Sequence, residues 1–127
     1  QSPEVMQEVS TLVIQAQSDL YEVRKMIHKI GFFIENEKFC MDAGKPYLVM
    51  RAVRGEEKTP YEPAEHEYGR LLPEVSDTAY RKFLLDERDK KMKLQETLNM
   101  QKTSGAGARV EELTEEITGL NWILNKF

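Results

Sequence analysis

The sequence is poor in the features that mark several common classes of protein. It has one cysteine in 127 residues, so it cannot form an internal disulfide. Its 18 lysine and arginine residues are outnumbered by 22 aspartate and glutamate residues, which gives a formal net charge of -4. Binding to nucleic acid depends on clustered positive charge that neutralises phosphates, so this balance predicts a chain without a nucleic-acid partner.

Long apolar runs are also missing. A helix that spans a bilayer needs about 20 consecutive apolar residues, and no run in this chain, which is 40% apolar overall, approaches that length. We therefore expect no membrane partner and an intracellular location. A chain of this length accommodates one modest domain, or a helical assembly whose core is completed by other chains.

What the sequence does contain is a periodic apolar pattern in its first third. Ser2, Pro3 and Glu4 are typical of a helix start, and Gly44 followed by Pro46 is typical of a helix end. Between these signals, apolar residues recur at alternating spacings of three and four, as at the a and d positions of a heptad. This first seam contains Met6, Val9, Val13, Ala16, Leu20, Val23, Ile27, Ile30 and Ile34.

The first seam predicts one long, coiled-coil-like helix over residues 1–44. Leu12, Met26 and Phe33 widen the apolar stripe, which favours a helix bundle or a multi-helix coiled coil over a plain two-stranded dimer. At 1.5 Å per residue such a helix is roughly 60 Å long. A compact domain of this size does not need so long a helix, so we expect another chain to cover part of the stripe.

The middle of the chain, residues 45–75, carries weaker signals. A short apolar run from Tyr47 to Val53 fits either a strand or one helical turn, and its length leaves both open. From Arg54 to Pro73 the composition becomes acidic and rich in proline. This composition predicts an irregular crossover or an extended linker.

Two further helices are predicted in the remainder of the chain. Residues 76–103 begin with a capping signal at Asp77 and continue as a charged helix. A Gly-rich break over 104–108 precedes a helix over 109–127 with a second heptad seam. The predicted fold is therefore all-α and forms one domain overall: a long heptad-patterned helix, a Pro-rich crossover, and two helices in an antiparallel hairpin, a bundle or a coiled coil.

Candidates for catalysis or metal binding are few. His28 flanks the first seam, and His66 lies in the acidic segment, which is not expected to fix the geometry of metal ligands. Cys40 lies near the end of the predicted first helix, where the helix dipole raises the pKa of a thiol. The Gly-rich break lacks the Gly-Lys-Ser/Thr ending of a phosphate-binding loop. We therefore predict that the chain is not an enzyme and has no catalytic residues, no metal and no cofactor.

These patterns favour a non-catalytic structural subunit that mediates assembly of a multi-protein complex through helix packing. The alternative is a chaperone or adaptor that binds a client peptide through residues 45–75. The predicted partners are other proteins or further copies of the chain, contacted through the two seams. The predicted partner interface consists of Met6, Val9, Val13, Leu20, Val23, Ile27, Ile30, Ile34, Val110, Leu113, Ile117, Leu120, Trp122 and Leu124.

Overall fold

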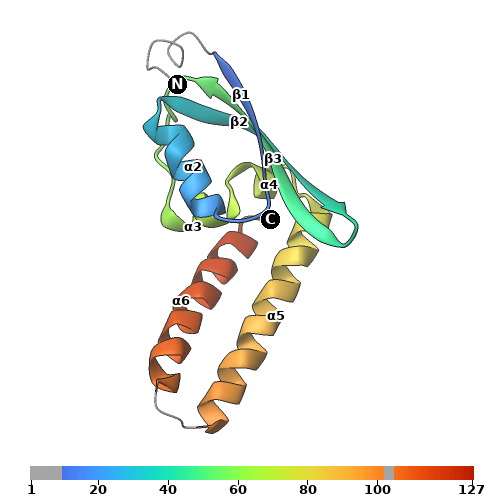
Figure 1. The fold of residues 1–127 in the computed structure, drawn as a ribbon, viewed down its shortest axis with the longest axis vertical. Coiled ribbons are helices and arrows are strands. Elements are labelled where there is room, and N and C mark those ends of the chain that lie inside the picture. Colours follow the sequence, from blue (N-terminus) through green and yellow to red (C-terminus); the bar gives the residue numbers. More distant parts are fainter. Residues whose placement is uncertain (1–9, 102–104) are drawn as a thin grey trace. The chain divides into compact units, whose positions relative to one another are not determined.

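The computed structural model describes residues 10–101 and 105–127. The chain divides into two compact units between Leu72 and Pro73, and Figure 1 shows a sheet with short helices in the first and a pair of long helices in the second. The elements are β1 (Thr11–Ala16), α2 (Leu20–Lys29), β2 (Phe32–Asp42), β3 (Lys45–Arg54), α3 (Pro63–Tyr68), α4 (Leu71–Glu74), α5 (Thr78–Gln101) and α6 (Ala106–Leu124).

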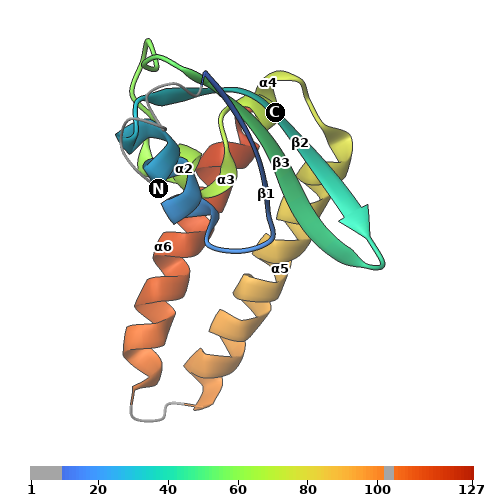
Figure 2. The same ribbon diagram turned by 45° about the horizontal axis from the view of Figure 1, so that its top comes forward.

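The first unit is built on a three-stranded antiparallel sheet in the order β1-β3-β2. The central strand β3 contains the apolar run for which the sequence left strand and helical turn open. Along β1, exposed and half-buried side chains alternate, which is the period of a strand with one covered face. Figure 2 shows α2 beside β2 on one side of the sheet.

The prediction of an all-α fold is wrong, because the described part of the segment expected to form one long helix, residues 10–44, contains a strand, a helix and a strand. Within this part only Leu20–Lys29 is α-helical. Gly31 ends this helix with φ of +86°, and its N–H donates to the carbonyl of His28 at 3.1 Å. A glycine in this left-handed conformation is a common helix stop, so Gly31 terminates the helix where the seam predicted continuation.

Gly44 and Pro46 were also misinterpreted as the end of a helix. Asp42 pairs with Lys45 across the β2–β3 hairpin, so Ala43 and Gly44 form a two-residue turn, with φ of +50° and +79°. Positive φ at both positions is the type I′ geometry that suits the twist of a hairpin. A glycine after a short polar stretch fits a helix C-cap and a hairpin turn equally well, and Pro46 is tolerated because it lies near the start of β3.

A β-bulge in β2 determines which side chains enter the core. The register with β3 shifts between Ile34 and Asn36. Before the bulge Phe32 and Ile34 are buried, and after it Glu37 and Phe39 are buried. The extra residue at a bulge changes the face toward which later side chains point. The bulge therefore turns a glutamate, Glu37, into the interior of the first unit.

The second unit is an antiparallel hairpin of α5 and α6. Asp77 caps α5, since its Oδ1 accepts the N–H of Tyr80 at 2.9 Å. Side chains join the two helices in antiparallel order: Lys91 pairs with Glu116 at 2.7 Å, and Gln95 donates to the hydroxyl of Thr114 at 2.7 Å. The buried apolar residues of these helices are Tyr80, Leu84, Ala106, Leu113, Leu120 and Ile123.

Candidate functional site

A buried ion pair holds three elements of the first unit together. The guanidinium of Arg24 on α2 contacts both carboxylate oxygens of Glu37 on β2, at 2.7 and 3.2 Å, and both side chains are fully buried. The third guanidinium nitrogen of Arg24, Nη1, donates to the backbone carbonyls of His66 and Glu67 on α3, at 2.7 and 2.8 Å. This fork of donors matches a carboxylate and two carbonyls at once, so Arg24 fixes α3 against α2 and the sheet.

A second arginine fixes the segment that precedes α3. Arg70 pairs with Glu65 at 2.7 Å and donates to the carbonyls of Thr59 and Pro60, at 2.7 and 2.8 Å. Its guanidinium also lies over the ring of Tyr61, 4.2 Å from the ring centroid. Arg70 therefore holds residues 59–61 in place, although their composition predicts an irregular segment.

These two anchors bring a glutamate and two histidines into one hydrogen-bonded chain. The carboxylate of Glu57 accepts from Nε2 of His28 at 2.8 Å and from the N–H of Ile34 at 3.0 Å. Nδ1 of His28 lies 2.9 Å from Nε2 of His66. Because Glu57 requires the Nε2 proton of His28, the neutral pair has Nδ1 of His28 as the acceptor and His66 as the donor. The chain thus orients both imidazole rings and fixes their tautomers.

The histidines form one wall of a pocket in the first unit. Tyr61 is the neighbouring wall, with its ring centroid 4.5 Å from that of His28 and 5.2 Å from that of His66. The pocket has a volume of ≈ 510 Å³, and Lys25, Lys29 and Phe32 are also part of its lining. Pockets of this size, lined mainly by apolar and aromatic groups with a few polar ones, are typical binding sites for small ligands or single chemical groups.

Burial changes the ionisation of two groups in the pocket. Burial raises the pKa of Tyr61, with a further contribution from the negative charges of Glu57 and Glu37, so its hydroxyl stays protonated at neutral pH. Among the described residues that hydroxyl has no hydrogen-bond partner. Burial lowers the pKa of His66 below its ordinary value of 6.5, and electrostatic interactions with the neighbouring His28, Lys25 and Arg24 lower it further. His66 is therefore neutral at physiological pH.

The lowered pKa of His66 predicts how stability depends on pH. Between the folded-state pKa and the unfolded value of 6.5, the unfolded chain binds more protons than the folded chain. The contribution of His66 to stability is thus complete above pH 6.5 and is lost as the pH falls through the lowered folded-state pKa. Urea unfolding from pH 7.5 to 5.5 is expected to show this loss, and the decline is expected to be shallower in His66→Gln. Parallel pH profiles for the two proteins would contradict the prediction.

The structure separates the residues of the predicted partner interface. Met6 and Val9 lie outside the described residues, and Val13 on β1 is 70% exposed. Ile27 and Ile34 are buried in the first unit, while Leu20 and Val23 are half-buried and Ile30 is exposed. In the second unit Leu113 and Leu120 are buried, Val110, Ile117 and Leu124 are half-buried, and Trp122 is exposed. The predicted interface residues therefore do not form two continuous seams, because some are buried in the core of a unit and others are exposed. Contact of these residues with a partner stays a prediction.

Sequence patterns identified only some of the pocket residues as candidates. His28 and His66 were considered and set aside as a seam flank and a loop residue, whereas Glu57 and Tyr61 gave no signal. Glu57 lies 29 positions after His28 in the chain, and His66 lies 38 positions after it. No short motif links positions so far apart. The capping box of Glu62 and Glu65, which begins α3, was the local signal that the acidic segment is ordered.

Comparison with known proteins identifies the family of the chain. Residues 1–121 match the family model described as TrmK: tRNA (adenine(22)-N(1))-methyltransferase. The chain belongs to the TrmK family. No curated protein sequence matches the chain.

Several solved structures share the fold of the chain. An uncharacterised protein from Listeria monocytogenes serotype 4b is 16% identical with a TM-score of 0.85, over 94% of this chain and 53% of that one. The B. subtilis m1A22 tRNA methyltransferase TrmK is 18% identical with a TM-score of 0.76, over 90% and 51%. M. capricolum TrmK, in complex with S-adenosyl-homocysteine, is 16% identical with a TM-score of 0.73, over 97% and 54%. The chain thus spans about half the length of these structures.

The family assignment corrects several predictions. The prediction of a non-catalytic assembly subunit is wrong, as is its adaptor alternative, because the TrmK family is a family of tRNA methyltransferases. The predictions that the chain is not an enzyme and has no nucleic-acid partner are wrong for the same reason. The negative net charge misled the second of these, because overall charge does not show where lysines and aromatic rings lie together.

Two kinds of feature are absent from the described part of the chain. None of its helices combines the length and apolar character needed to cross a bilayer. Residues 10–101 and 105–127 also contain no group of three or more histidine, cysteine, aspartate or glutamate side chains arranged to hold a metal ion. The ligand-binding features of the pocket are its aromatic rings, its lysines and the hydrogen-bonded chain of Glu57, His28 and His66.

Proposed function

We propose that the chain forms about half of an enzyme that transfers a methyl group to N1 of adenine 22 in tRNA. The observation that carries this proposal is the family match over residues 1–121. It is supported by the fold, since a putative tRNA (m1A22) methyltransferase from Streptococcus pneumoniae matches 96% of the chain with a TM-score of 0.73. We further propose that the chain acts inside the cell, where tRNA is found.

The methyl donor implied by the family is S-adenosylmethionine, which is bound in another structure of the Streptococcus pneumoniae protein. Nucleotide cofactors are commonly held at a glycine-rich turn from a strand to a helix, where no Cβ blocks close approach to the backbone. In this chain the turn from β1 to α2 contains no glycine. At Gly55 the space for a Cβ faces the ring of Phe33, and at Gly69 it is filled by Arg24 and Glu37. The described residues do not fit the donor, and we infer that it binds outside them.

The position of the methylated atom determines in which state of the RNA the adenine can react. N1 of adenine lies on the Watson–Crick edge, so it is not accessible while the base is paired. Enzymes that modify such atoms act on unpaired bases or turn the base out of its stack, and they hold it by stacking and hydrogen bonds. The role that we assign to this chain is to hold RNA in such a state, through groups that stack on bases and contact phosphates.

The experiment is methyl transfer by the polypeptide that carries this chain, with radiolabelled S-adenosylmethionine and unmodified tRNA transcripts. Two transcripts that differ only by adenine or guanine at position 22 form the matched pair. We expect label in the adenine transcript alone, and a stop of reverse transcription beside position 22, because a methyl group on N1 blocks base pairing. Equal labelling of the guanine transcript, or a stop elsewhere, would overturn the proposal.

A further inference from the structure

The pocket described above combines two features that single-stranded RNA requires. Its walls are rings: His28, His66 and Tyr61 lie with their centroids within 5.2 Å of one another, and Phe32 is also part of the lining. Most of the lining is apolar. Rings of this kind stack on bases of any sequence, because every base has a π-face.

The second feature is a pair of lysines on the rim. Lys25 and Lys29 are one helical turn apart on α2, both side chains are exposed, and both line the pocket. Lys25 lies over the ring of Tyr21, 5.2 Å from its centroid, and neither lysine has an ion pair among the described residues. Residues four apart on a helix lie on the same face. The two ammonium groups therefore present positive charge beside the aromatic walls.

Two acidic residues, Glu56 and Glu57, line the pocket together with the lysines. The carboxylate of Glu57 is engaged by His28 and by the backbone N–H of Ile34, so its charge is already stabilised within the protein. Glu56 also lines the pocket, and its side chain is exposed to solvent. Neither lysine has an ion pair among residues 10–101 and 105–127, and a phosphate is a counter-charge that an RNA ligand supplies.

We propose that this pocket holds one unpaired nucleotide of the RNA substrate, with its base against Tyr61 and the histidines and its flanking phosphates at Lys25 and Lys29. This proposal rests on the proposed function, which makes RNA the substrate. It adds the part of the chain that contacts the RNA and the groups that do so. The hydroxyl of Tyr61 is buried and has no hydrogen-bond partner among the described residues, so we assign the contact with the base to the rings and not to this hydroxyl.

The test is equilibrium binding of the 127-residue chain to a fluorescently labelled tRNA transcript and to an unstructured RNA of about ten nucleotides, over a range of salt concentrations. In the double variant Lys25→Gln, Lys29→Gln we expect affinity for both RNAs to fall about tenfold or more. The slope of log affinity against log salt is expected to fall by about one to two, since each phosphate contact contributes roughly 0.7 to 0.9. Affinity within twofold of the unchanged chain would overturn the proposal.

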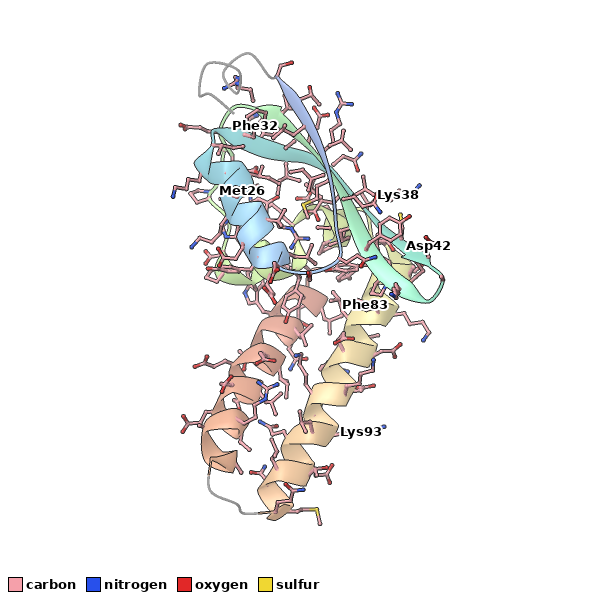
Figure 3. The ribbon with its side chains drawn as sticks, in the orientation of Figure 1. Met26, Phe32, Lys38, Asp42, Phe83 and Lys93 are labelled. Atoms are coloured by element: carbon pink, nitrogen blue, oxygen red, sulfur yellow. The ribbon has the colours of Figure 1, made fainter. Side chains whose placement is uncertain are left out.

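The matched control removes the same charge from the same unit. Lys38 on β2 and Lys45 on β3 are exposed lysines, and Figure 3 shows Lys38 and the hairpin end at Asp42 far along β2 from Phe32, which lines the pocket. The double variant Lys38→Gln, Lys45→Gln should bind within twofold of the unchanged chain. If both double variants lose affinity equally, binding follows overall charge and the proposed pocket is wrong.

The ring contact needs a separate measurement. A short RNA that contains 4-thiouridine, irradiated in complex with the chain, is expected to cross-link within residues 59–66. Cross-links confined to other segments would show that the pocket does not hold an RNA nucleotide. Failure of this proposal leaves methylation at position 22 intact, whereas failure of the proposed function abolishes methylation and leaves RNA binding measurable.

Discussion

Replacing Glu37 by alanine is expected to lower the free energy of unfolding of the chain by about 3–5 kcal/mol. The reason is that Arg24 and Glu37 are both fully buried, so the substitution leaves a buried guanidinium without its carboxylate. Arg24 would keep its hydrogen bonds to the two backbone carbonyls of α3, which carry no full negative charge to replace the carboxylate of Glu37. Chemical denaturation of the purified chain, followed by circular dichroism, measures the loss.

A control for this prediction lies two residues away on the same strand. Glu35 pairs with Arg51 at 2.9 Å, but its side chain is 48% exposed and that of Arg51 is 54% exposed. An exposed ion pair contributes about 0–1 kcal/mol, because solvent screens the charges. Glu35→Ala should therefore change stability by less than 1 kcal/mol. Equal losses in the two variants would mean that burial of the Arg24–Glu37 pair does not determine its contribution.

The same pair shows why the fold of the first unit was not predictable from apolar spacing. The seam from Val13 to Ile34 was judged by its apolar members alone, although Arg24 and Glu37, both charged, are among the buried residues. The apolar residues of the short helix α2 are spaced three and four apart, and by chance the same spacing continues in the strands on either side. Pairing with β3 makes these flanking segments, β1 and β2, strands rather than parts of the helix. Strand pairing is a long-range property that a local period does not contain.

The second unit was more accessible to sequence analysis for the converse reason. The buried Leu113 and Leu120 of α6 and the capping Asp77 of α5 are signals carried within single helices. Helix signals are local, since the hydrogen bonds and neighbouring side chains of a helix involve residues three and four apart. The ion pair of Lys91 with Glu116 follows only once the two helices are placed side by side, and spacing did not predict it.

The candidate site had the least support in the sequence. Its walls come from α2, from the segment 57–61 and from α3, and Arg24 and Arg70 hold these parts together through backbone carbonyls. Every residue has a backbone carbonyl, so the amino-acid types in the sequence do not show which carbonyls accept these hydrogen bonds. The acidic, proline-rich composition around His66 predicted an irregular crossover or an extended linker, whereas this segment contains a capped helix bound by two arginines.

Replacing Ile27 by alanine is the second change for which we expect a large effect. Ile27 lies on α2, is fully buried, and is one of the residues that cover the sheet of the first unit. Removing three methyl or methylene groups from a packed core costs about 2–5 kcal/mol, the sum of lost transfer energy and the cavity that remains. We expect urea unfolding to show a loss in this range, and Ile27→Asp not to fold, because it would bury an unpaired carboxylate.

The adjacent Met26 provides the matched control. It is on the same helix but 49% exposed, so Met26→Ala should change stability by no more than about 0.5 kcal/mol. A large loss of unfolding free energy for Ile27→Ala together with a small loss for Met26→Ala would show that α2 stabilises the first unit through its packing on the sheet. If the two losses were reversed, the face of α2 that packs on the sheet would be the one that carries Met26, and not the one that carries Ile27.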